Sequence, residues 1–371
     1  MKIVVVSSLT PIATANYLVQ AMKRAGDELL VISDVASPHA DVTTSGGSHD
    51  VSAICRRRGF APDLAFFIEG GTMQVLPTGL ERLACPAAWY GIDSHTNCEG
   101  HVRLARLFDL SFICHKQFLL RIEAESARPA HWLPVACPRE LLPDPNQPRT
   151  IDVGFVGALD AARYPQRVRR LEAIREVAGK VEFGLAPPAE MMQRYARSKI
   201  VFNSSFNNDL NMRYFEAMGA GAALLTDVIT ESGVEELFEA GRHYLVYRSD
   251  EELIATIKDL LADPEKARVI GGAARAEIEA RHTYDHRVER LKAAVKGLRK
   301  SVRPGPADYF AAFAAVNMPA AALQSAGRGL LEMGSGTRWQ MLNKTLGMTL
   351  LAAGAAGQVM SRALSRLRRQ P

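Results

Sequence analysis

Short apolar runs alternate with longer segments of helical periodicity through most of the chain. The runs occupy residues 1–6, 29–33, 64–68, 87–90, 112–114 and 132–135, and then residues 151–156, 181–184, 199–203, 222–226 and 244–247. Helical patterns fall between them, for example at about 15–24 and 188–198. Strands that alternate with helices form parallel sheets. The pattern therefore predicts an α/β fold with doubly wound parallel sheets.

A break near the middle of the chain indicates two sheet domains. Residues 137–149, CPRELLPDPNQPR, are rich in proline and poor in apolar residues, which is typical of a linker or hinge. At 371 residues the chain is also too long for one hydrophobic core. We predict a first domain over 1–137, a linker over 138–150, a second domain over 151–300 and an Ala-rich, helix-prone extension over 301–371.

The composition is that of a globular protein, with 47% apolar and 23% charged residues. The net charge is +5, but the 45 basic and 40 acidic residues are mixed through most of the sequence. No basic–aromatic pattern of a nucleic-acid module is present, so we expect no nucleic-acid partner. A phosphate-bearing substrate or an anionic surface accounts for the excess of positive charge equally well.

The first half excludes some classes of protein. Its first loop, residues 7–14, contains no glycine, so the dinucleotide fingerprint of nicotinamide-dependent dehydrogenases is absent. Residues 36–50 are rich in Ser, Thr, Gly and His and predict a mobile loop. The five cysteines form no CxxC pair, and the apolar run at 3–6 is too short for a signal peptide. We therefore expect a cytoplasmic protein.

The most informative stretch is residues 199–227, KIVFNSSFNNDLNMRYFEAMGAGAALLTD, which predicts a strand, a polar loop, a short helix and a second strand. Asn211 is placed as the helix N-cap, where free N–H groups favour an anion. Arg213 and Glu216 share one helix face, and a guanidinium suits phosphate while a carboxylate suits a pair of sugar hydroxyls. The alternative is an ion pair on the helix surface.

NMRYFEAMGAGAALLTD resembles the donor-site motif of group-1 glycosyltransferases, and most of all the CgeB-like (spore maturation protein) branch. The resemblance continues in DVGFVGAL, MMQRYARSKIVFNSS, ELFEAGRHYLVYRSDEELIATI and RHTYDHRVERL, and covers mainly residues 150–295. It implies the GT-B fold, in which two Rossmann-like domains face each other. It also implies a nucleotide-diphosphate sugar as donor, with no cofactor and no bound metal for catalysis.

The resemblance assigns donor-binding roles to the second domain. Glu216 matches the second glutamate of the family's paired-glutamate motif, which holds the donor ribose. Asn208 stands where the first glutamate belongs, with Asp209 beside it. After Gly157, a loop carrying Arg163 leads to a helix.

Related glycosyltransferases hold the donor diphosphate at this loop, so Gly157, Arg163 and Arg167 are predicted donor-binding residues. The two arginines are equally compatible with a solvated helix face.

The first domain, on the acceptor side, carries the candidate catalytic residues. Asp93 and His95 follow the run at 87–90, and CgeB-like members are similar in having Asp-x-His at this point. His95 would exchange a proton with an acceptor hydroxyl or the departing phosphate, and Asp93 would orient the ring. The alternative is a loop histidine bonded to backbone. His95, Cys98 and His101 have a metal-like spacing, but on a helix they diverge, so we expect no metal site.

The resemblance therefore implies a metal-independent hexosyltransferase that acts on a protein, a surface glycan or a lipid-linked acceptor. Two alternatives stay open, a nucleotide-sugar epimerase on the same fold and a catalytically degenerate scaffold. In the extension, the uncharged residues 345–361 precede several arginines. This pattern fits a helix on the cytoplasmic face of an anionic membrane, and equally self-association or packing against the first domain.

Overall fold

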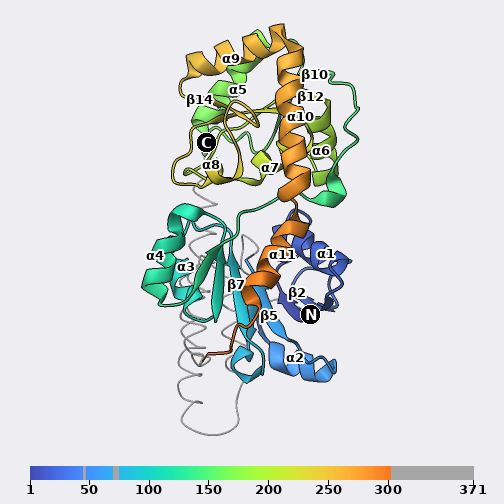
Figure 1. The fold of residues 1–371 in the computed structure, drawn as a ribbon, viewed down its shortest axis with the longest axis vertical. Coiled ribbons are helices and arrows are strands. Elements are labelled where there is room, and N and C mark those ends of the chain that lie inside the picture. Colours follow the sequence, from blue (N-terminus) through green and yellow to red (C-terminus); the bar gives the residue numbers. More distant parts are fainter. Residues whose placement is uncertain (45–46, 70–74, 302–371) are drawn as a thin grey trace, which may run out of the picture. The chain divides into compact units, whose positions relative to one another are not determined.

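The computed structural model describes residues 1–44, 47–69 and 75–301, which fold as two compact units (Figure 1). The first unit contains Met1–Cys114, Phe118–Leu133 and the chain from Leu291, and the second contains His115–Gln117 and Pro134–Arg290. Residues 138–150, the predicted linker, lie in the second unit. The predicted helical extension lies outside the described residues, apart from Ser301.

The first unit is built on a seven-stranded parallel sheet of order β3-β2-β1-β5-β7-β8-β9. Its strands are β1 (Lys2–Val6), β2 (Glu28–Ser33), β3 (Val42–Thr43), β5 (Leu64–Ile68), β7 (Ala87–Gly91), β8 (Leu110–Ile113) and β9 (Ala130–Trp132). Its helices are α1 (Thr14–Arg24), α2 (Val51–Arg57), α3 (Cys98–Ala105) and α4 (Leu119–Ser126), with 3-10 turns η1 (Leu80–Arg82) and η2 (Lys116–Phe118). The core under α2, α3 and α4 is centred on Phe67, Trp89 and Phe108.

One prediction for this unit is wrong. The sequence predicts a mobile loop over 36–50, but this segment contains β3, which extends the main sheet beside β2, and β4 (Gly47–Asp50). β4 pairs in parallel with β6 (Val75–Thr78) in a separate two-stranded sheet. β3 and β4 are short and carry few apolar residues, so they leave no run that a periodicity argument detects.

The second unit has a five-stranded parallel sheet of order β11-β10-β12-β13-β14. Its strands are β10 (Ile151–Val156), β11 (Val181–Gly184), β12 (Ser198–Phe202), β13 (Ala223–Asp227) and β14 (Leu245–Tyr247). Its helices are α5 (Pro165–Val177), α6 (Pro188–Arg197), α7 (Met212–Gly219), α8 (Val234–Leu237), α9 (Asp250–Ala262) and α10 (Pro264–Arg281), with the 3-10 turn η3 (Arg139–Leu141). The last helix, α11 (Tyr284–Val295), begins in this unit and ends in the first.

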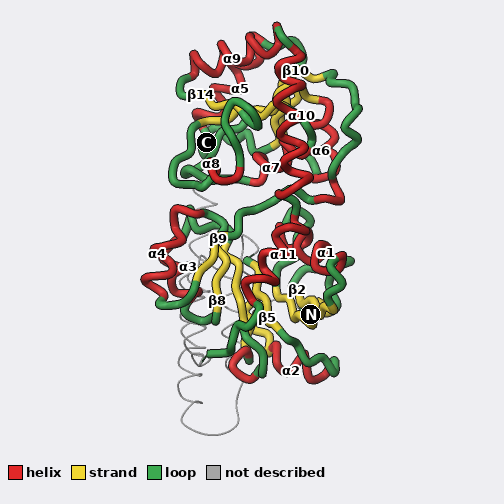
Figure 2. Tube along the Cα trace, viewed as in Figure 1, coloured by secondary structure: helices red, strands yellow, loops and turns green. Residues whose placement is uncertain are grey.

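Side chains alternate across the second sheet, as expected for strands that are covered on both faces. Val153 and Phe155 point to the face where α5 and α9 bury Leu171, Ile174 and Leu253. Figure 2 shows the same alternation of strands and helices through both units. The predicted architecture of two doubly wound parallel-sheet domains is therefore confirmed for the described residues.

Candidate functional site

The carboxyl ends of neighbouring strands in the second unit form a row of polar groups. The register pairs Gly154 with Val201 and Phe202 with Leu225. Continued along the strands, it brings Val156 beside Asn203 and Asn203 beside Thr226. Asn203 Nδ2 accordingly donates to Thr226 Oγ1 at 2.9 Å. Ligands of open α/β sheets bind at this edge.

Arg213 lies in the first turn of α7 and bonds to two members of this row, Val156 and Asn203. Its guanidinium donates to the Val156 carbonyl, with Nη2 at 2.8 Å, and to Asn203 Oδ1. Nε also lies 3.3 Å from the Tyr195 hydroxyl. The side chain is half-buried and the helix directs it to the strand ends, so it is not an ion pair on an exposed helix face.

Arg167 brings a second positive charge to the same place. It is 9% exposed, and its guanidinium donates to the carbonyls of Ser204 at 3.0 Å and Ala158 at 3.4 Å. Burial, and next the charge of Arg213, lower the pKa of Arg167. Its Nε is buried without a hydrogen-bond partner among the described residues. Two guanidiniums this close favour a bound anion.

Gly157 leaves room for the Arg213 guanidinium. A Cβ atom at this position would lie 2.8 Å from Arg213 Nη2 and 2.8 Å from the Phe155 ring. Any larger residue would therefore displace the arginine from the strand end. The predicted donor-site residues Gly157, Arg167 and Arg213 thus lie together in the structure.

Glu216 follows one turn after Arg213 on α7 and is 7% exposed. Its carboxylate makes no hydrogen bond or ion pair within the described ranges 1–44, 47–69 and 75–301. Burial raises the pKa of Glu216 to about 7, against the opposing effect of Arg213. A buried carboxylate without donors is costly, and a ligand that brings hydroxyl groups would supply them.

Asn211 occupies the predicted N-cap position of α7, but its side chain does not cap the helix. Instead its Nδ2 lies 3.4 Å from Asn203 Oδ1 and 3.3 Å from Asp209 Oδ1. Its Oδ1 is buried and has no partner in the described part of the chain. Asn211 therefore belongs to the polar row of Asn203 and Arg213, and it leaves the helix N-terminus without its usual side-chain acceptor.

Asn208 has a different place, because it ties the loop before α7 to the loop after β13. Its Oδ1 accepts from Thr230 N at 2.7 Å, and its Nδ2 donates to the Thr230 carbonyl at 2.5 Å. Asn207 and Asn208 both have positive φ angles, 50° and 61°, which asparagine tolerates better than most residues. Asp209 Oδ1 accepts from Phe206 N at 2.8 Å. Asn208 and Asp209 therefore fix the loop's shape.

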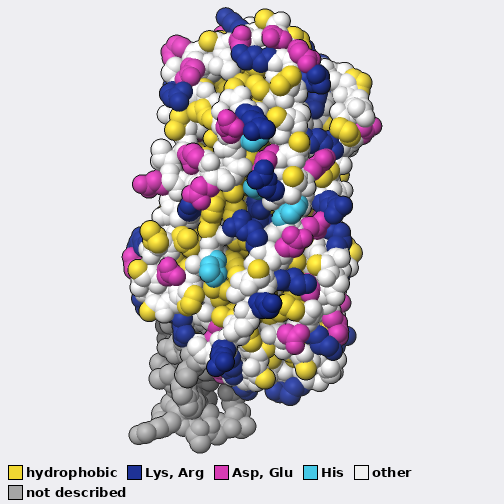
Figure 3. Space-filling view, viewed as in Figure 1, with side chains coloured by type: hydrophobic (Ala, Val, Ile, Leu, Met, Phe, Trp, Pro, Cys, Tyr) yellow, Lys and Arg dark blue, Asp and Glu magenta, His cyan; other side chains and the backbone are white. Residues whose placement is uncertain are grey.

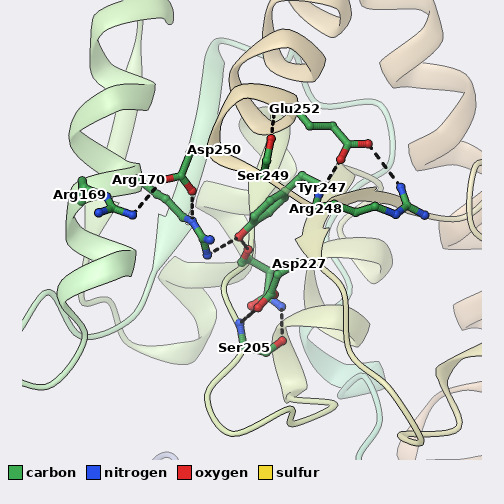
Figure 4. A network of polar contacts seen from close by, with 10 residues as sticks. Arg169, Arg170, Ser205, Asp227, Tyr247, Arg248, Ser249, Asp250 and Glu252 are labelled. Atoms are coloured by element: carbon green, nitrogen blue, oxygen red, sulfur yellow. Dashed lines mark hydrogen bonds and ion pairs between the residues drawn. The ribbon is translucent and has the colours of Figure 1, made fainter.

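A network of polar side chains holds the start of the same loop (Figure 4). Both carboxylate oxygens of Asp227 accept from Ser205 N, at 2.9 and 3.1 Å. The Tyr247 hydroxyl donates to the Asn203 carbonyl at 3.0 Å, and Arg170 reaches that hydroxyl at 3.3 Å while holding Asp250 at 2.7 Å. These contacts fix the backbone that presents Asn203 to the site.

Arg163 is exposed, and it shares the Tyr164 ring with Arg167, whose guanidinium lies 4.0 Å from the ring centroid. The Arg163 guanidinium lies over the rings of Tyr164 and Phe206, at 5.3 and 5.9 Å from their centroids. Those two rings meet edge-to-face at 5.5 Å. Figure 3 shows basic and acidic side chains interspersed over the visible face, in line with the mixed charge of the sequence.

Asp93 and His95 lie in the turn that follows β7, at the carboxyl edge of the first sheet. The Asp93 carbonyl accepts from Thr96 N at 2.9 Å and from Thr96 Oγ1 at 2.8 Å. Both residues are half-buried. His101, which shares a metal-like spacing with His95, turns instead to Glu69, with Nε2 and Oε1 3.1 Å apart. Among the residues that the structure describes, no group of three His, Cys, Asp or Glu side chains could hold a metal ion.

Several residues of the site were not predicted from the sequence. Asn203 and Tyr195 contact Arg213, and Phe155 lies under both guanidiniums. Each belongs to an apolar or ordinary strand or helix pattern. Strand register places Phe155 and Asn203, and the packing of α6 places Tyr195. Within the described ranges, no helix is long and apolar enough to cross a bilayer, and the uncharged stretch 345–361 lies outside them.

Comparisons with known proteins bear on the family and the fold. The sequence profile of a family described as glycosyl transferase-like matches residues 143–293. No curated protein sequence matches the chain. The sucrose-phosphate synthase structure from Thermosynechococcus elongatus superposes with a TM-score of 0.57 at 15% identity, over 80% of this chain and 99% of that one.

Two other solved structures are similar. HepE of Anabaena, in complex with UDP and glucose, gives a TM-score of 0.55 at 15% identity, over 80% of this chain and 100% of that one. An alpha-glucosyltransferase in complex with UDP-glucose and DNA gives 0.55 at 11% identity, over 80% and 99%. The chain therefore has the GT-B glycosyltransferase fold, and its second unit carries a glycosyl transferase-like sequence.

Proposed function

We propose that this protein is a glycosyltransferase of the CgeB-like type, which transfers a hexose from a nucleotide-diphosphate sugar without a bound metal. The observation that carries the proposal is the buried carboxylate of Glu216, which has no hydrogen-bond partner among the described residues and lies one turn from Arg213. The two hydroxyls of a ribose fit a carboxylate, and Arg167 and Arg213 suit a diphosphate. The UDP complex of the similar HepE structure supports this class of donor.

In this proposal the donor is held entirely by the second unit. Glu216 accepts from the ribose hydroxyls, the two arginines neutralise the diphosphate, and Gly157 lets the loop after β10 approach it. As the glycosidic bond to phosphate breaks, negative charge grows on the diphosphate, and the fixed guanidiniums stabilise it. Asp93 and His95 of the first unit serve the acceptor, a protein, a surface glycan or a lipid-linked carrier, with His95 taking the hydroxyl proton. The five free cysteines support a cytoplasmic location.

UDP release from UDP-glucose tests the proposal. We expect slow release with water as acceptor, which His95→Ala lowers through kcat while KM stays nearly unchanged. Glu216→Ala should instead raise KM, because the ribose loses its acceptor. A wild-type protein that releases no UDP, GDP or ADP from the corresponding glucose donors would overturn the assignment.

A degenerate scaffold is the second candidate, and Asn208 favours it. The position of the family's first glutamate holds an amide that is already bonded to Thr230. An Asn208→Glu variant separates the two readings. If the protein is an enzyme in which Asn208 takes the place of the glutamate, Asn208→Glu breaks the bonds to Thr230 and lowers turnover. A scaffold has no turnover, so the variant leaves none to measure.

A further inference from the structure

A buried polar cluster of Glu69, Ser94 and His101 lies in the first unit, outside the residues used above. Glu69 follows β5, Ser94 lies in the turn after β7, and His101 is on α3. Their exposed fractions are 4%, 1% and 0%. His101 links the other two, with Nε2 3.1 Å from Glu69 Oε1 and Nδ1 2.9 Å from Ser94 Oγ. The Trp89 ring packs against the His101 imidazole in a T-shaped arrangement, with the ring centroids 5.0 Å apart.

Glu69 also holds the backbone of the turn that contains Asp93 and His95. Its second oxygen, Oε2, accepts from Ile92 N at 2.8 Å and lies 3.4 Å from Asp93 N. Burial alone would raise the pKa of Glu69, but His101 and these two N–H groups outweigh it and lower the pKa. The carboxylate is therefore charged, with Oε2 bonded to the turn and Oε1 to His101.

The cluster contacts the turn after β7 at two points. Glu69 fixes the backbone at Ile92 and Asp93, and His101 fixes the side chain of Ser94, the residue between Asp93 and His95. An apolar cluster of equal volume would fill the same space without burying a charge, which is costly. A buried charge bonded to the backbone of one turn specifies the geometry of that turn.

We propose that Glu69 and His101 are positioning residues, which hold the turn so that Asp93 and His95 meet the acceptor in reactive geometry. The proposal rests on the proposed glycosyltransferase function. A misplacement of about 1 Å at a reacting group costs on the order of a hundredfold in rate. Loss of the cluster should therefore lower turnover of the donor while the donor itself still binds.

Asp109 provides a matched control in the same unit. It is also 4% exposed, and its carboxylate accepts from the backbone N–H of Ala87 at 2.7 Å. Ala87 begins β7, whereas Glu69 holds the turn at the other end of the same strand. Asp109 also accepts from Ser301 N at 2.7 Å and from Ser301 Oγ at 2.6 Å. Glu69→Ala and Asp109→Ala thus each remove a buried carboxylate that holds backbone at one end of β7, but only the first is at the predicted catalytic edge.

The experiment combines kinetics, thermal unfolding and NMR on the full chain, with UDP-glucose as donor. Both alanine variants should lower Tm to a similar extent. Glu69→Ala should lower kcat for UDP release by about tenfold or more, with KM changed less than about threefold. Glu69→Gln should recover part of this loss, because its amide oxygen still accepts from Ile92 N. Asp109→Ala should keep kcat near the wild-type value.

A double variant decides whether Glu69 acts through the turn. If it does, Glu69→Ala combined with His95→Ala is no slower than His95→Ala alone. Fully additive losses, or equal losses of kcat in Glu69→Ala and Asp109→Ala, overturn the proposal. Should Glu69→Ala fail to fold, Ser94→Ala removes one hydroxyl from the same cluster and takes its place.

The NMR signal of the His95 ring separates the two proposals. It should shift in Glu69→Ala and stay in place in Asp109→Ala, whether or not the protein releases UDP. A wild-type protein without UDP release contradicts the glycosyltransferase function, and a shift confined to Glu69→Ala then still supports the positioning role. An unshifted His95 signal in Glu69→Ala overturns the positioning role by itself.

Discussion

Arg167 and Arg213 place their guanidinium carbons over the same aromatic ring, 5.6 and 4.5 Å from the centroid of Phe155. Arg167 comes from α5 and donates to the Ala158 and Ser204 carbonyls, whereas Arg213 comes from α7 and donates to the Val156 carbonyl. Two positive charges on one ring repel each other, and the structure holds them there through backbone carbonyls. This arrangement leaves a site that a doubly charged diphosphate would complete.

The first prediction concerns this pair. Arg213→Lys and Arg167→Lys should each weaken UDP binding by about tenfold or more, because lysine cannot reproduce a two-pronged contact with phosphate oxygens. Uridine binding should change much less. Arg169→Lys is the control, because Arg169 is also on α5 but is exposed and pairs with Asp250 at 3.0 Å. An equal loss of UDP affinity in Arg169→Lys would mean that general positive charge, and not this pair, binds the diphosphate.

The second prediction is a pH dependence set by Glu216. Its pKa is raised to about 7, so half of the free protein carries a neutral carboxyl at that pH. Ribose hydroxyls bind the ionised form, so binding releases a proton and the affinity for UDP rises with pH, by about tenfold from pH 6 to pH 8. Calorimetry in buffers of different ionisation enthalpy measures the released proton.

Glu216→Gln is the control for this pH dependence. It keeps the titration of the UDP phosphate itself and loses the contribution of the carboxyl group. Identical pH profiles for the wild type and Glu216→Gln would show that Glu216 does not titrate on binding.

The third prediction compares two adjacent glycines of α10. A Cβ atom on Gly271 would lie 2.0 Å from the Gly221 carbonyl oxygen, whereas a Cβ on Gly272 would meet nothing within 4 Å. Gly271→Ala must therefore push α10 away from the turn after α7, and it should lower the free energy of unfolding by about 1–3 kcal/mol. Gly272→Ala should raise it by about 0.5–1 kcal/mol through helix propensity. Urea unfolding measures both, and a destabilising Gly272→Ala would contradict the packing described.

The fourth prediction concerns Arg149, which lies at the C-terminal ends of α6 and α7. Its guanidinium donates to the carbonyls of Tyr195, Ser198, Ala220 and Gly221, which lie at the ends of α6 and α7. Arg149→Met leaves these carbonyls without that donor, so the free energy of unfolding should fall by about 2–4 kcal/mol.

Arg268→Met is the matched control for Arg149. Arg268 is exposed, and within the described residues its ion pair is with Glu265, so its loss should cost less than about 0.5 kcal/mol. Comparable losses in the two variants would show that the four carbonyl contacts contribute little.

Most strands and helices of the second unit could be predicted because their signals are local. The apolar runs place β10, β12 and β13 within about two residues, and Asp263-Pro264 marks the start of α10 through a side chain that accepts from Lys266 N at 3.2 Å. Caps were harder to predict, because neighbouring polar residues compete. Ser249 and Asp250 are both of residue types that cap helices, and in the structure Ser249 caps α9, accepting from Glu252 N at 3.1 Å.

The partners of the site residues could not be predicted, because they lie far away in sequence. Helical spacing alone puts Arg213 and Glu216 on one face, but only the register of β10 and β12 shows that Arg213 reaches Val156 and Asn203. Likewise, Glu69 and His101 are separated by 32 residues, and no local pattern pairs them. Sequence periodicity identifies an element and its buried face, whereas the contacts between loops depend on the order of strands in the sheet.

The central claim is that the carboxyl edge of the second sheet binds a nucleoside diphosphate through Glu216 and the two arginines. Isothermal titration calorimetry with UDP, GDP and ADP, on the wild type and on Glu216→Ala, tests it most directly. We predict that at least one nucleotide binds the wild type with micromolar Kd and binds Glu216→Ala at least about tenfold more weakly. Failure of all three to bind, or equal binding to both proteins, would contradict the account.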